Sequence, residues 1–250
     1  MRGSRYMCMA VASFSLQAQV AEPILTKTAV PFGTGAGSLK LDYAGGIGPE
    51  GGSSQVIPEG TLEVGVRDGL EMLARFPLLR VNLGGLHDTV IGGGQLATGA
   101  RYLLAGGADR PYGLAIQGIV EVPTGDSRLV GNATQVMPTL LWYWRPIGQM
   151  FVYSNLTFDR SIGGTGRSVA FLEYQAAITW SATSHFVPAF EFVGSTNTIE
   201  GGTQLAGVPE LIFRAGPNLE LKAGLQLGLN ARTPELGMRV QLGWFWGKRQ

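Results

Sequence analysis

The chain has 250 residues, of which 45% are hydrophobic and 15% charged; 38 residues are glycine, and the formal net charge is +1. Soluble domains carry roughly 25% charged residues and about half this share of glycine, so the composition departs from the soluble average. A net charge near zero gives no reason to expect an acidic partner, and we expect no nucleic-acid binding. The sequence holds no run of 18 apolar residues, which excludes a transmembrane helix.

The first 21 residues resemble a secretory signal peptide. Arg2 and Arg5 precede a moderately apolar stretch that ends in small residues. A disordered N-terminus is the alternative. Cys8 is the only cysteine and lies in this stretch, so a processed chain would need no disulfide chemistry.

From about residue 38 onward, apolar and polar residues alternate in twelve segments with turn signals between them. Two-residue alternation predicts strands with two unlike faces. The expected strands lie near residues 39–43, 61–67, 70–76, 96–104, 112–122, 136–144, 150–159, 172–180, 186–192, 210–214, 219–229 and 237–246. Beyond Pro77 the alternation changes parity, and we expect a β-bulge there.

The connections between these segments alternate in length. Long connections are expected at 45–60, 84–94, 122–131, 160–167 and 195–207, with short ones between them; only the connection at 231–234 is short where a long one is due. Bacterial outer-membrane barrels have an even number of strands, short periplasmic turns and longer extracellular loops. The pattern therefore predicts an all-β fold, a single antiparallel up-and-down transmembrane β-barrel of about 12 strands.

The chemistry of the two faces favours lipid outside and a charged interior. The apolar face carries no Asp, Glu, Lys or Arg in any clear strand, as expected where Lys or Arg costs about 2–4 kcal/mol at the membrane midplane. Twelve tilted strands close into a cylinder roughly 25 Å across, too wide for Leu and Val alone to fill. Lys40 and Asp42 share the polar face with the candidate lumen-lining residues Glu63, Glu71, Arg75, Arg101, Glu121, Glu173, Glu191, Glu210, Arg214, Glu220, Lys222 and Arg239. A soluble β-sandwich remains the alternative fold.

Aromatic residues gather where one membrane interface is expected. About 10 residues per strand, tilted by 45°, project to about 24 Å, close to the apolar band of outer-membrane barrels. Aromatic girdles mark both edges of such a band. The candidate interface aromatics are Trp142, Trp144, Trp180, Trp244 and Trp246. We divide the chain accordingly into a signal peptide (1–21), a periplasmic N-terminal segment (22–37), an outer-membrane barrel (38–246) and a short basic tail (247–250).

Two stretches, LEVGVRDGLEMLARFPLLRVN (62–82) and TPELGMRVQLGWFW (233–246), carry a family resemblance. They resemble the bacterial outer-membrane transporters associated with the meta-pathway of phenol degradation, and the resemblance extends loosely over residues 30–246. It implies a Gram-negative outer-membrane barrel and uptake of aromatic or other small hydrophobic compounds. It supplies no catalytic or binding residue.

The sequence offers little support for catalysis. An outer-membrane lipid hydrolase would need a Ser activated by a His that a third polar group orients. The chain has only His87 and His185, which are expected at opposite ends of the barrel. The glycine-rich stretches at 33–37, 91–99 and 162–168 lack phosphate-loop spacing, and no calcium-loop pattern is present. We expect no enzyme activity, no cofactor and no metal.

The mixed interior charges leave two readings open. They indicate either a polar conduit for a small-molecule solute or a salt-bridged plug that closes a structural or interaction barrel. Near-equal opposite charges argue against strong selectivity for anions or cations. The expected partners are outer-membrane lipids and, during insertion, the barrel-assembly machinery, since residues 237–246 resemble its C-terminal signal apart from the four residues that follow.

Overall fold

A computed structural model describes residues 22–47, 53–82, 89–126, 132–164, 170–233 and 236–248. Within these ranges no helix is long and apolar enough to span a membrane. The strands are β1 (Gly37–Ile47), β2 (Ser53–Arg67), β3 (Leu70–Asn82), β4 (Thr89–Gly93), β5 (Leu96–Gly106), β6 (Tyr112–Val122), β7 (Thr134–Ile147), β8 (Met150–Ile162), β9 (Ala170–Trp180), β10 (Phe186–Asn197), β11 (Thr203–Arg214), β12 (Leu219–Gly228) and β13 (Leu236–Trp246). The predicted signal peptide and His87 lie outside the described residues.

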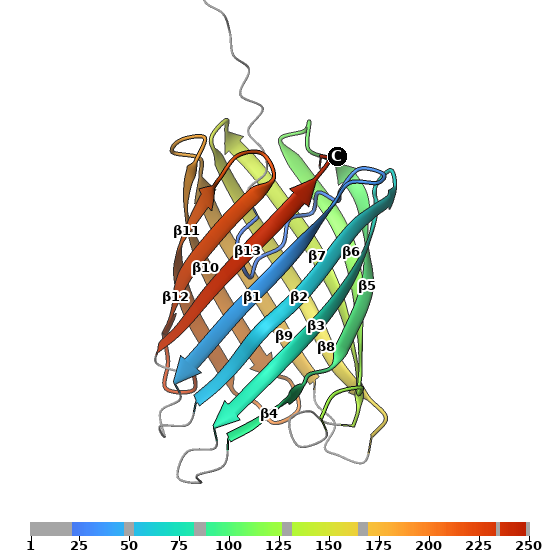
Figure 1. Cartoon of the computed structure of the whole chain (residues 1–250), viewed down its shortest axis with the longest axis vertical. Helices are drawn as coiled ribbons and strands as arrows, with labels where there is room; N and C mark the ends of the chain where they lie inside the picture. Colours follow the sequence, from blue (N-terminus) through green and yellow to red (C-terminus); the bar gives the residue numbers. More distant parts are fainter. Residues whose placement is uncertain are drawn as a thin grey trace, which may run out of the picture.

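All the strands except β4 close into one antiparallel barrel (Figure 1). Each strand of this ring pairs with its neighbours in the chain, and the ring closes where β1 pairs with β13. That pairing runs without interruption from Gly37 opposite Trp246 to Ile47 opposite Leu236. Full closure leaves the ring itself without an unpaired edge, which is what backbone groups in a membrane require. The prediction of a twelve-stranded antiparallel barrel is confirmed.

The short strand β4 was not expected, because residues 84–94 were predicted as a loop. β4 pairs with the Leu78–Asn82 part of β3, whereas β5 pairs with the Leu70–Arg75 part. β4 therefore continues the place of β5 along β3 after a break at Gly94, whose N–H donates to the carbonyl of Pro77 at 2.7 Å. The loop prediction is wrong for residues 89–93.

The bulge that was expected beyond Pro77 lies on the neighbouring strand. On β2 and β3, Val56 stands opposite Leu79 and Glu59 opposite Pro77, so β2 carries one extra residue. Pro58 lies in this interval and has no N–H to give to the ladder, which is where a bulge costs least. The location on β3 was therefore wrong, and β3 itself continues without a change of parity.

The two ends of the barrel differ in their connections. At one end, which we call the short-turn end, consecutive strands are joined by 68–69, 107–111, 148–149, 181–185 and 215–218. At the other, the long-loop end, the connections include 123–133 and 229–235. The predicted long connections at 45–60 and 195–207 are wrong, because β1 runs to Ile47 and β2 begins at Ser53, and because β10 runs to Asn197 and β11 begins at Thr203. The connection predicted as short at 231–234 is the longer 229–235 in the structure. The C-terminus lies at the short-turn end (Figure 1).

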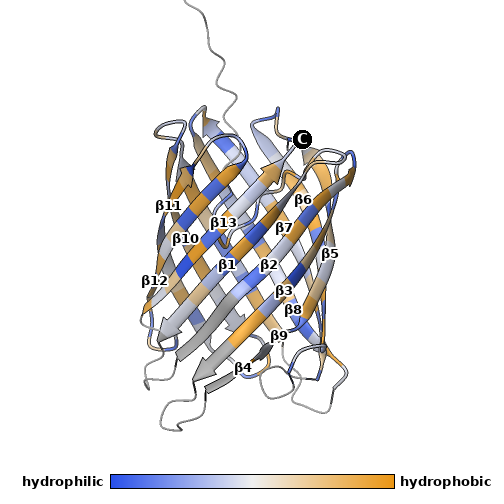
Figure 2. Cartoon of the chain, viewed as in Figure 1, coloured by the Kyte–Doolittle hydropathy of each residue, from blue (hydrophilic) through white to orange (hydrophobic). Residues whose placement is uncertain are grey.

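The two faces of the wall have opposite chemistry. Leu41 of β1 and Leu242 of β13 stand opposite each other and are 45% and 43% exposed on the outer face. Their chain neighbours Lys40 and Gln241 point inward and are 0% and 1% exposed. Apolar and polar residues alternate along the other strands as well (Figure 2). The outer surface is thus an apolar belt around a polar interior.

Candidate functional site in the barrel lumen

The N-terminal segment 22–32 lies inside the barrel, in the half nearest the short-turn end (Figure 1). Glu22, Thr26, Thr28 and Val30 are all buried. The sequence analysis expected residues 22–37 to be a periplasmic segment, whereas the structure shows residues 22–32 inside the barrel. The sequence of this segment shows no apolar–polar alternation. The segment is a bent chain rather than a strand, and it contacts the barrel wall on several sides. We call residues 22–32 the lumen segment.

A charge network fastens the lumen segment to β1, β2, β3 and β5. Lys40 Nζ lies 2.7 Å from Glu22 Oε2 and 2.7 Å from Glu63 Oε2. Arg101 reaches the carboxylates of Glu63 at 3.8 Å and Glu71 at 3.4 Å. All five side chains are almost completely buried. Two cations and three carboxylates thus neutralise most of each other's charge where water is scarce, the condition under which buried ions are tolerated.

Acidic residues of β10 and β11 hold the backbone of the lumen segment. The carboxylate of Glu191 accepts hydrogen bonds from the N–H groups of Leu25 (3.1 Å) and Thr26 (2.6 Å) and from the Thr26 hydroxyl (2.8 Å). Glu210 Oε2 accepts from the N–H of Ile24 at 3.2 Å. These acids serve as acceptors for backbone donors that have no strand partner, so the segment needs them.

On β12, Lys222 holds the same stretch from its carbonyl side, since its Nζ donates to the backbone oxygen of Glu22 at 2.6 Å. Near the end of the segment, the N–H of Phe32 donates to Glu71 Oε2 at 2.9 Å. Donors and acceptors of the segment therefore both find charged partners on the wall, and such charge-assisted bonds are the strong ones.

An apolar cluster holds the remaining side of the lumen segment against β6 to β9. Ala29 and Val30 pack with buried wall residues, and the wall members are Ala115, Leu141, Tyr143, Phe151, Tyr153 and Ala177. Phe151 and Tyr153 stack with ring centroids 6.2 Å apart. The sequence analysis expected a polar inner face, and this cluster is an exception to it. Large inward side chains therefore pack with the segment in the half of the barrel nearest the short turns.

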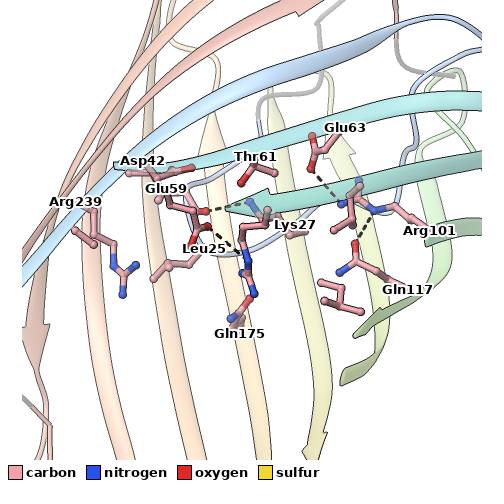
Figure 3. A pocket seen from close by; sticks show the side chains of 15 residues that line it. Leu25, Lys27, Asp42, Glu59, Thr61, Glu63, Arg101, Gln117, Gln175 and Arg239 are labelled. Atoms are coloured by element: carbon pink, nitrogen blue, oxygen red, sulfur yellow. Dashed lines mark hydrogen bonds and ion pairs between the residues drawn. The ribbon is translucent and has the colours of Figure 1, made fainter. Parts of the chain in front are cut away.

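On the side of the lumen segment that faces the long-loop end, the interior contains a cavity of about 260 Å³ (Figure 3). Four cations, Lys27, Arg75, Arg101 and Arg239, project towards it. The carboxylates of Asp42, Glu59 and Glu63 line it as well, together with the amides of Gln117 and Gln175. The cavity also touches apolar side chains of Ile24, Leu25, Leu73 and Ile119. Both signs of charge and some apolar surface are therefore within reach of a solute.

The twelve predicted lumen residues all lie on the inner face. Those that are buried are Glu63, Glu71, Arg101, Glu191, Glu210, Arg214, Glu220 and Lys222. Those that are half-buried are Arg75, Glu121, Glu173 and Arg239. The structure brings Arg75 together with Glu59 (3.7 Å) and Glu121, and Arg214 with Glu220 (3.0 Å).

The predicted interface tryptophans lie towards the short-turn end. Trp142, Trp144, Trp180 and Trp244 are exposed on the outer face. Trp246 is half-buried, and its indole Nε1 donates to the carbonyl of Gly35 at 3.0 Å. This last tryptophan therefore also ties the wall to the chain that leaves the lumen segment.

Lys27 is the only ionisable side chain of the lumen segment besides Glu22. Its Nζ donates to the carbonyl of Ile24 at 3.4 Å. Burial lowers the pKa of the Lys27 ammonium, and the positive charge of Lys40 acts in the same direction. When the lumen segment is bound inside the barrel, which we call its seated state, the protonated form of Lys27 is therefore disfavoured.

The described residues contain one histidine and no metal-binding cluster. Within them, no group of three or more His, Cys, Asp or Glu side chains could hold a metal ion. His185 is exposed in a short turn, and its Nδ1 lies 3.0 Å from the carbonyl of Arg214. It therefore contacts a backbone oxygen at the barrel end rather than a serine in the lumen.

The fold is similar to that of solved outer-membrane barrels. No protein-family model matches the chain, and no curated protein matches it. An outer membrane channel from Pseudomonas putida F1 aligns with a TM-score of 0.69 and 11% identity, over 91% of this chain and 100% of that one. The NanC porin aligns with a TM-score of 0.58 and 10% identity, over 83% and 98% of the two chains. The KdgM porin in complex with disordered oligogalacturonate gives 0.57 and 10% identity, with the same coverage.

The sequence reasoning missed the lumen segment, and it placed the anchors Glu191, Glu210 and Lys222 on the inner face without a partner. The available signal was the surplus of acids among the predicted lumen residues, seven Glu against five Lys or Arg. Acids buried in a lumen need donors, and backbone N–H groups of a non-strand segment can supply them. The pattern could have suggested an inserted segment, but it could not have said which one.

Proposed function

We propose that this chain is an outer-membrane channel that allows passive passage of small molecules, with its short-turn end in the periplasm. The observation that carries the proposal is a closed barrel with an apolar outer belt and a charged interior that contains a cavity open to polar solutes. The likeness to barrels described as porins and channels supports the same reading. Outer-membrane lipids would surround the apolar belt, and the barrel-assembly machinery would insert it.

The lumen segment limits what such a channel can pass. Its contacts with Lys40, Glu191 and Lys222 span the interior, so a solute must move past the segment or displace it. The same contacts support the second candidate, a structural or interaction barrel with a plugged interior. An enzyme receives no support from the described residues, and we propose none.

The solute class implied by the family resemblance, aromatic or other small hydrophobic compounds, stays a prediction. Membership of the phenol meta-pathway family stays a prediction as well, because no family model matches. The cavity holds apolar side chains beside its charges, which is compatible with a small solute that has one apolar side.

Conductance of the purified protein in planar lipid bilayers tests the proposal. We expect small, well-defined current steps for the full chain and larger steps for a variant that lacks residues 22–32. If neither protein passes current, although heat-modifiable gel mobility shows that each is folded, the channel proposal is wrong and the second candidate, a structural or interaction barrel, is favoured. Cell fractionation checks the outer-membrane location independently.

A further inference from the structure

Side chains of the wall hold residues 24–27 of the lumen segment by their backbone. We propose that this part of the wall is a peptide-binding site, which the chain's own segment occupies, and that short extended peptides bind there in its place. The inference rests on the proposed channel function, because a peptide must enter the lumen to reach the site, and it names a ligand class for that lumen.

Carboxylates of β10 and β11 accept three consecutive N–H groups of the segment. The N–H of Ile24 donates to Glu210 Oε2 at 3.2 Å. Glu191 accepts from the N–H groups of Leu25 at 3.1 Å and Thr26 at 2.6 Å. Every residue except proline offers the same backbone donor, so these acceptors do not depend on the side chains that the bound stretch carries. Both acids are buried, and such charge-assisted bonds are strong where water is scarce.

An amide and an ammonium group complete the contact with the backbone. Asn155 of β8 presents its side-chain amide so that Oδ1 accepts from the N–H of Lys27 at 2.6 Å and Nδ2 donates to the Lys27 carbonyl at 2.9 Å. One side chain thus supplies the two bonds that a neighbouring antiparallel strand gives to an extended residue. Lys222 of β12 donates to the carbonyl of Glu22 at 2.6 Å. The wall therefore binds both the donors and the acceptors of a peptide backbone.

The side chains of the same stretch are less closely specified. Those of Ile24, Leu25 and Lys27 line the cavity (Figure 3), where side chains of other sizes have room. Lys27 Nζ donates to the carbonyl of Ile24, which belongs to the segment itself. Thr26 is the exception, since its hydroxyl donates to Glu191 at 2.8 Å. Main-chain hydrogen bonds give affinity for many sequences, and side-chain pockets restrict them, so we expect broad sequence tolerance here.

The residue at position 22 adds a charge requirement. Lys40 Nζ lies 2.7 Å from Glu22 Oε2, and Arg101 Nη1 lies 3.9 Å from Glu22 Oε1. Both cations are buried, and a buried cation that loses a carboxylate partner is costly. The preferred ligand is therefore a peptide with an acidic residue two positions before the bound N–H groups and no proline among the residues that donate them.

The lumen segment competes with any peptide that enters the barrel. It precedes β1 in the same chain, and a short tether gives an effective concentration on the order of millimolar. A free peptide replaces it only at a similar concentration, or when the segment is weakened. Thr26→Pro weakens the segment without altering the wall, because proline has neither the N–H nor the hydroxyl that Glu191 accepts.

Single-channel recording on the full-length Thr26→Pro protein tests the inference. Its current steps should be larger than those of the wild type, and a capped synthetic peptide of residues 22–29 should return them to wild-type size in a saturable way. Photo-cross-linking reads binding without a current. The peptide with a photoreactive residue in place of Leu25 should label the lumen wall of Thr26→Pro, and that of the wild type only at peptide concentrations on the order of millimolar.

Comparison peptides separate recognition of the backbone from recognition of side chains. Alanine in place of Ile24, Leu25 and Lys27 keeps every backbone group and should weaken binding by less than about tenfold. Methyl groups on the backbone nitrogens of Leu25 and Thr26 remove two charge-assisted bonds and should weaken binding by about a hundredfold or more.

A wall variant checks the same contact from the side of the barrel. Glu191→Gln in the Thr26→Pro background should weaken binding of the unmodified peptide by about tenfold or more, because the acceptor loses its charge. The control is Thr139→Val in the same background, which removes a hydroxyl that bonds to Thr157 at 2.9 Å and should leave peptide binding unchanged.

Equal binding of the N-methylated and unmodified peptides would overturn the inference, and so would loss of binding with the alanine peptide, since side chains would then be what the wall recognises. Absence of cross-links in proteins shown to be folded by heat-modifiable gel mobility would overturn it as well; if Thr26→Pro does not fold, the wild-type cross-link decides. Current steps that no peptide changes, without cross-links, would remove the peptide site and leave the channel. Cross-links in a protein that passes no current would remove the channel and leave the site.

Discussion

Glu191 is the residue whose removal should release the lumen segment most directly. It is fully buried, and its carboxylate is the acceptor for the N–H groups of Leu25 and Thr26 and for the Thr26 hydroxyl. Glu191→Ala leaves these three donors without their acceptor. A buried donor that loses its acceptor costs about 1–3 kcal/mol, so three such donors cost about 3–9 kcal/mol. Water that enters the space left by the side chain reduces this cost, and we expect the segment bound in the lumen to lose roughly 3–6 kcal/mol of stability. The equilibrium between released and seated segment should shift by about 10²- to 10⁴-fold.

Single-channel recording reads this equilibrium as the time spent in a larger conductance state. Wild-type channels should occupy that state rarely, and Glu191→Ala should occupy it often. Glu191→Gln keeps one acceptor oxygen and should give an intermediate occupancy. A thiol reagent should also label Thr26→Cys faster in the Glu191→Ala background, with Cys8 replaced by Ser to leave one reactive thiol.

The control for this prediction is Thr139→Val, which removes a buried inner-face hydroxyl that hydrogen-bonds to Thr157 at 2.9 Å and, in the part of the chain that the structure describes, does not contact the lumen segment. It should lower stability without changing the occupancy of the larger state. If Glu191→Ala leaves occupancy and labelling at wild-type values while deletion of residues 22–32 raises conductance, the assignment of Glu191 as an anchor is wrong. If the deletion also changes nothing, the segment does not limit the pore.

Three further predictions concern the wall and the segment. Lys40→Met removes the cation 2.7 Å from each of two buried carboxylates and should destabilise the barrel by about 3–5 kcal/mol, read as a lower denaturant midpoint in detergent. Leu242→Arg places a charge on the apolar belt and should cost about 2–4 kcal/mol in lipid vesicles, whereas Leu242→Phe should fold like wild type. The pKa of Lys27 is lowered when the lumen segment is seated, so seating costs free energy while Lys27 is protonated. This cost becomes smaller as the pH rises towards the ordinary pKa of 10.5, because less Lys27 is then protonated in the released state. Occupancy of the larger state should therefore fall with rising pH in the wild type, and in Lys27→Met it should be low at every pH; a pH dependence retained in Lys27→Met would contradict the mechanism.

The strand pattern could be predicted because each residue of a barrel wall carries its own signal. Leu41 beside Lys40 places an apolar residue outside and a polar one inside, and the same rule holds along the ring except where apolar residues such as Leu141 and Ile212 also face inward. The errors arose where backbone hydrogen bonds, rather than side-chain pattern, decide the structure. β4 pairs through its backbone along β3, and the bulge at Pro58 follows from a missing N–H on β2.

The candidate site was predicted only in part. Arg75, Glu173 and Arg239 could be assigned to the inner face from alternation, but their partners could not. Arg75 meets Glu59 of the neighbouring strand, whereas Arg239 donates to the side-chain oxygen of Gln226. Which charges pair depends on strand register and side-chain reach, and these are set when the sheet closes.

The sequence by itself determined the class of fold, the number of strands in the ring and which face of each strand lies on the outer surface of the barrel. It could do so because apolar–polar alternation with a period of two is a local property of the chain. Only the tertiary structure decided what fills the interior. The lumen segment has no period, and its anchors are remote in sequence: Thr26 meets Glu191, and the carbonyl of Glu22 meets Lys222, 200 residues away. Such contacts exist only once closure of the ring has brought β10 and β12 around a segment that precedes β1, so no local pattern could have indicated them.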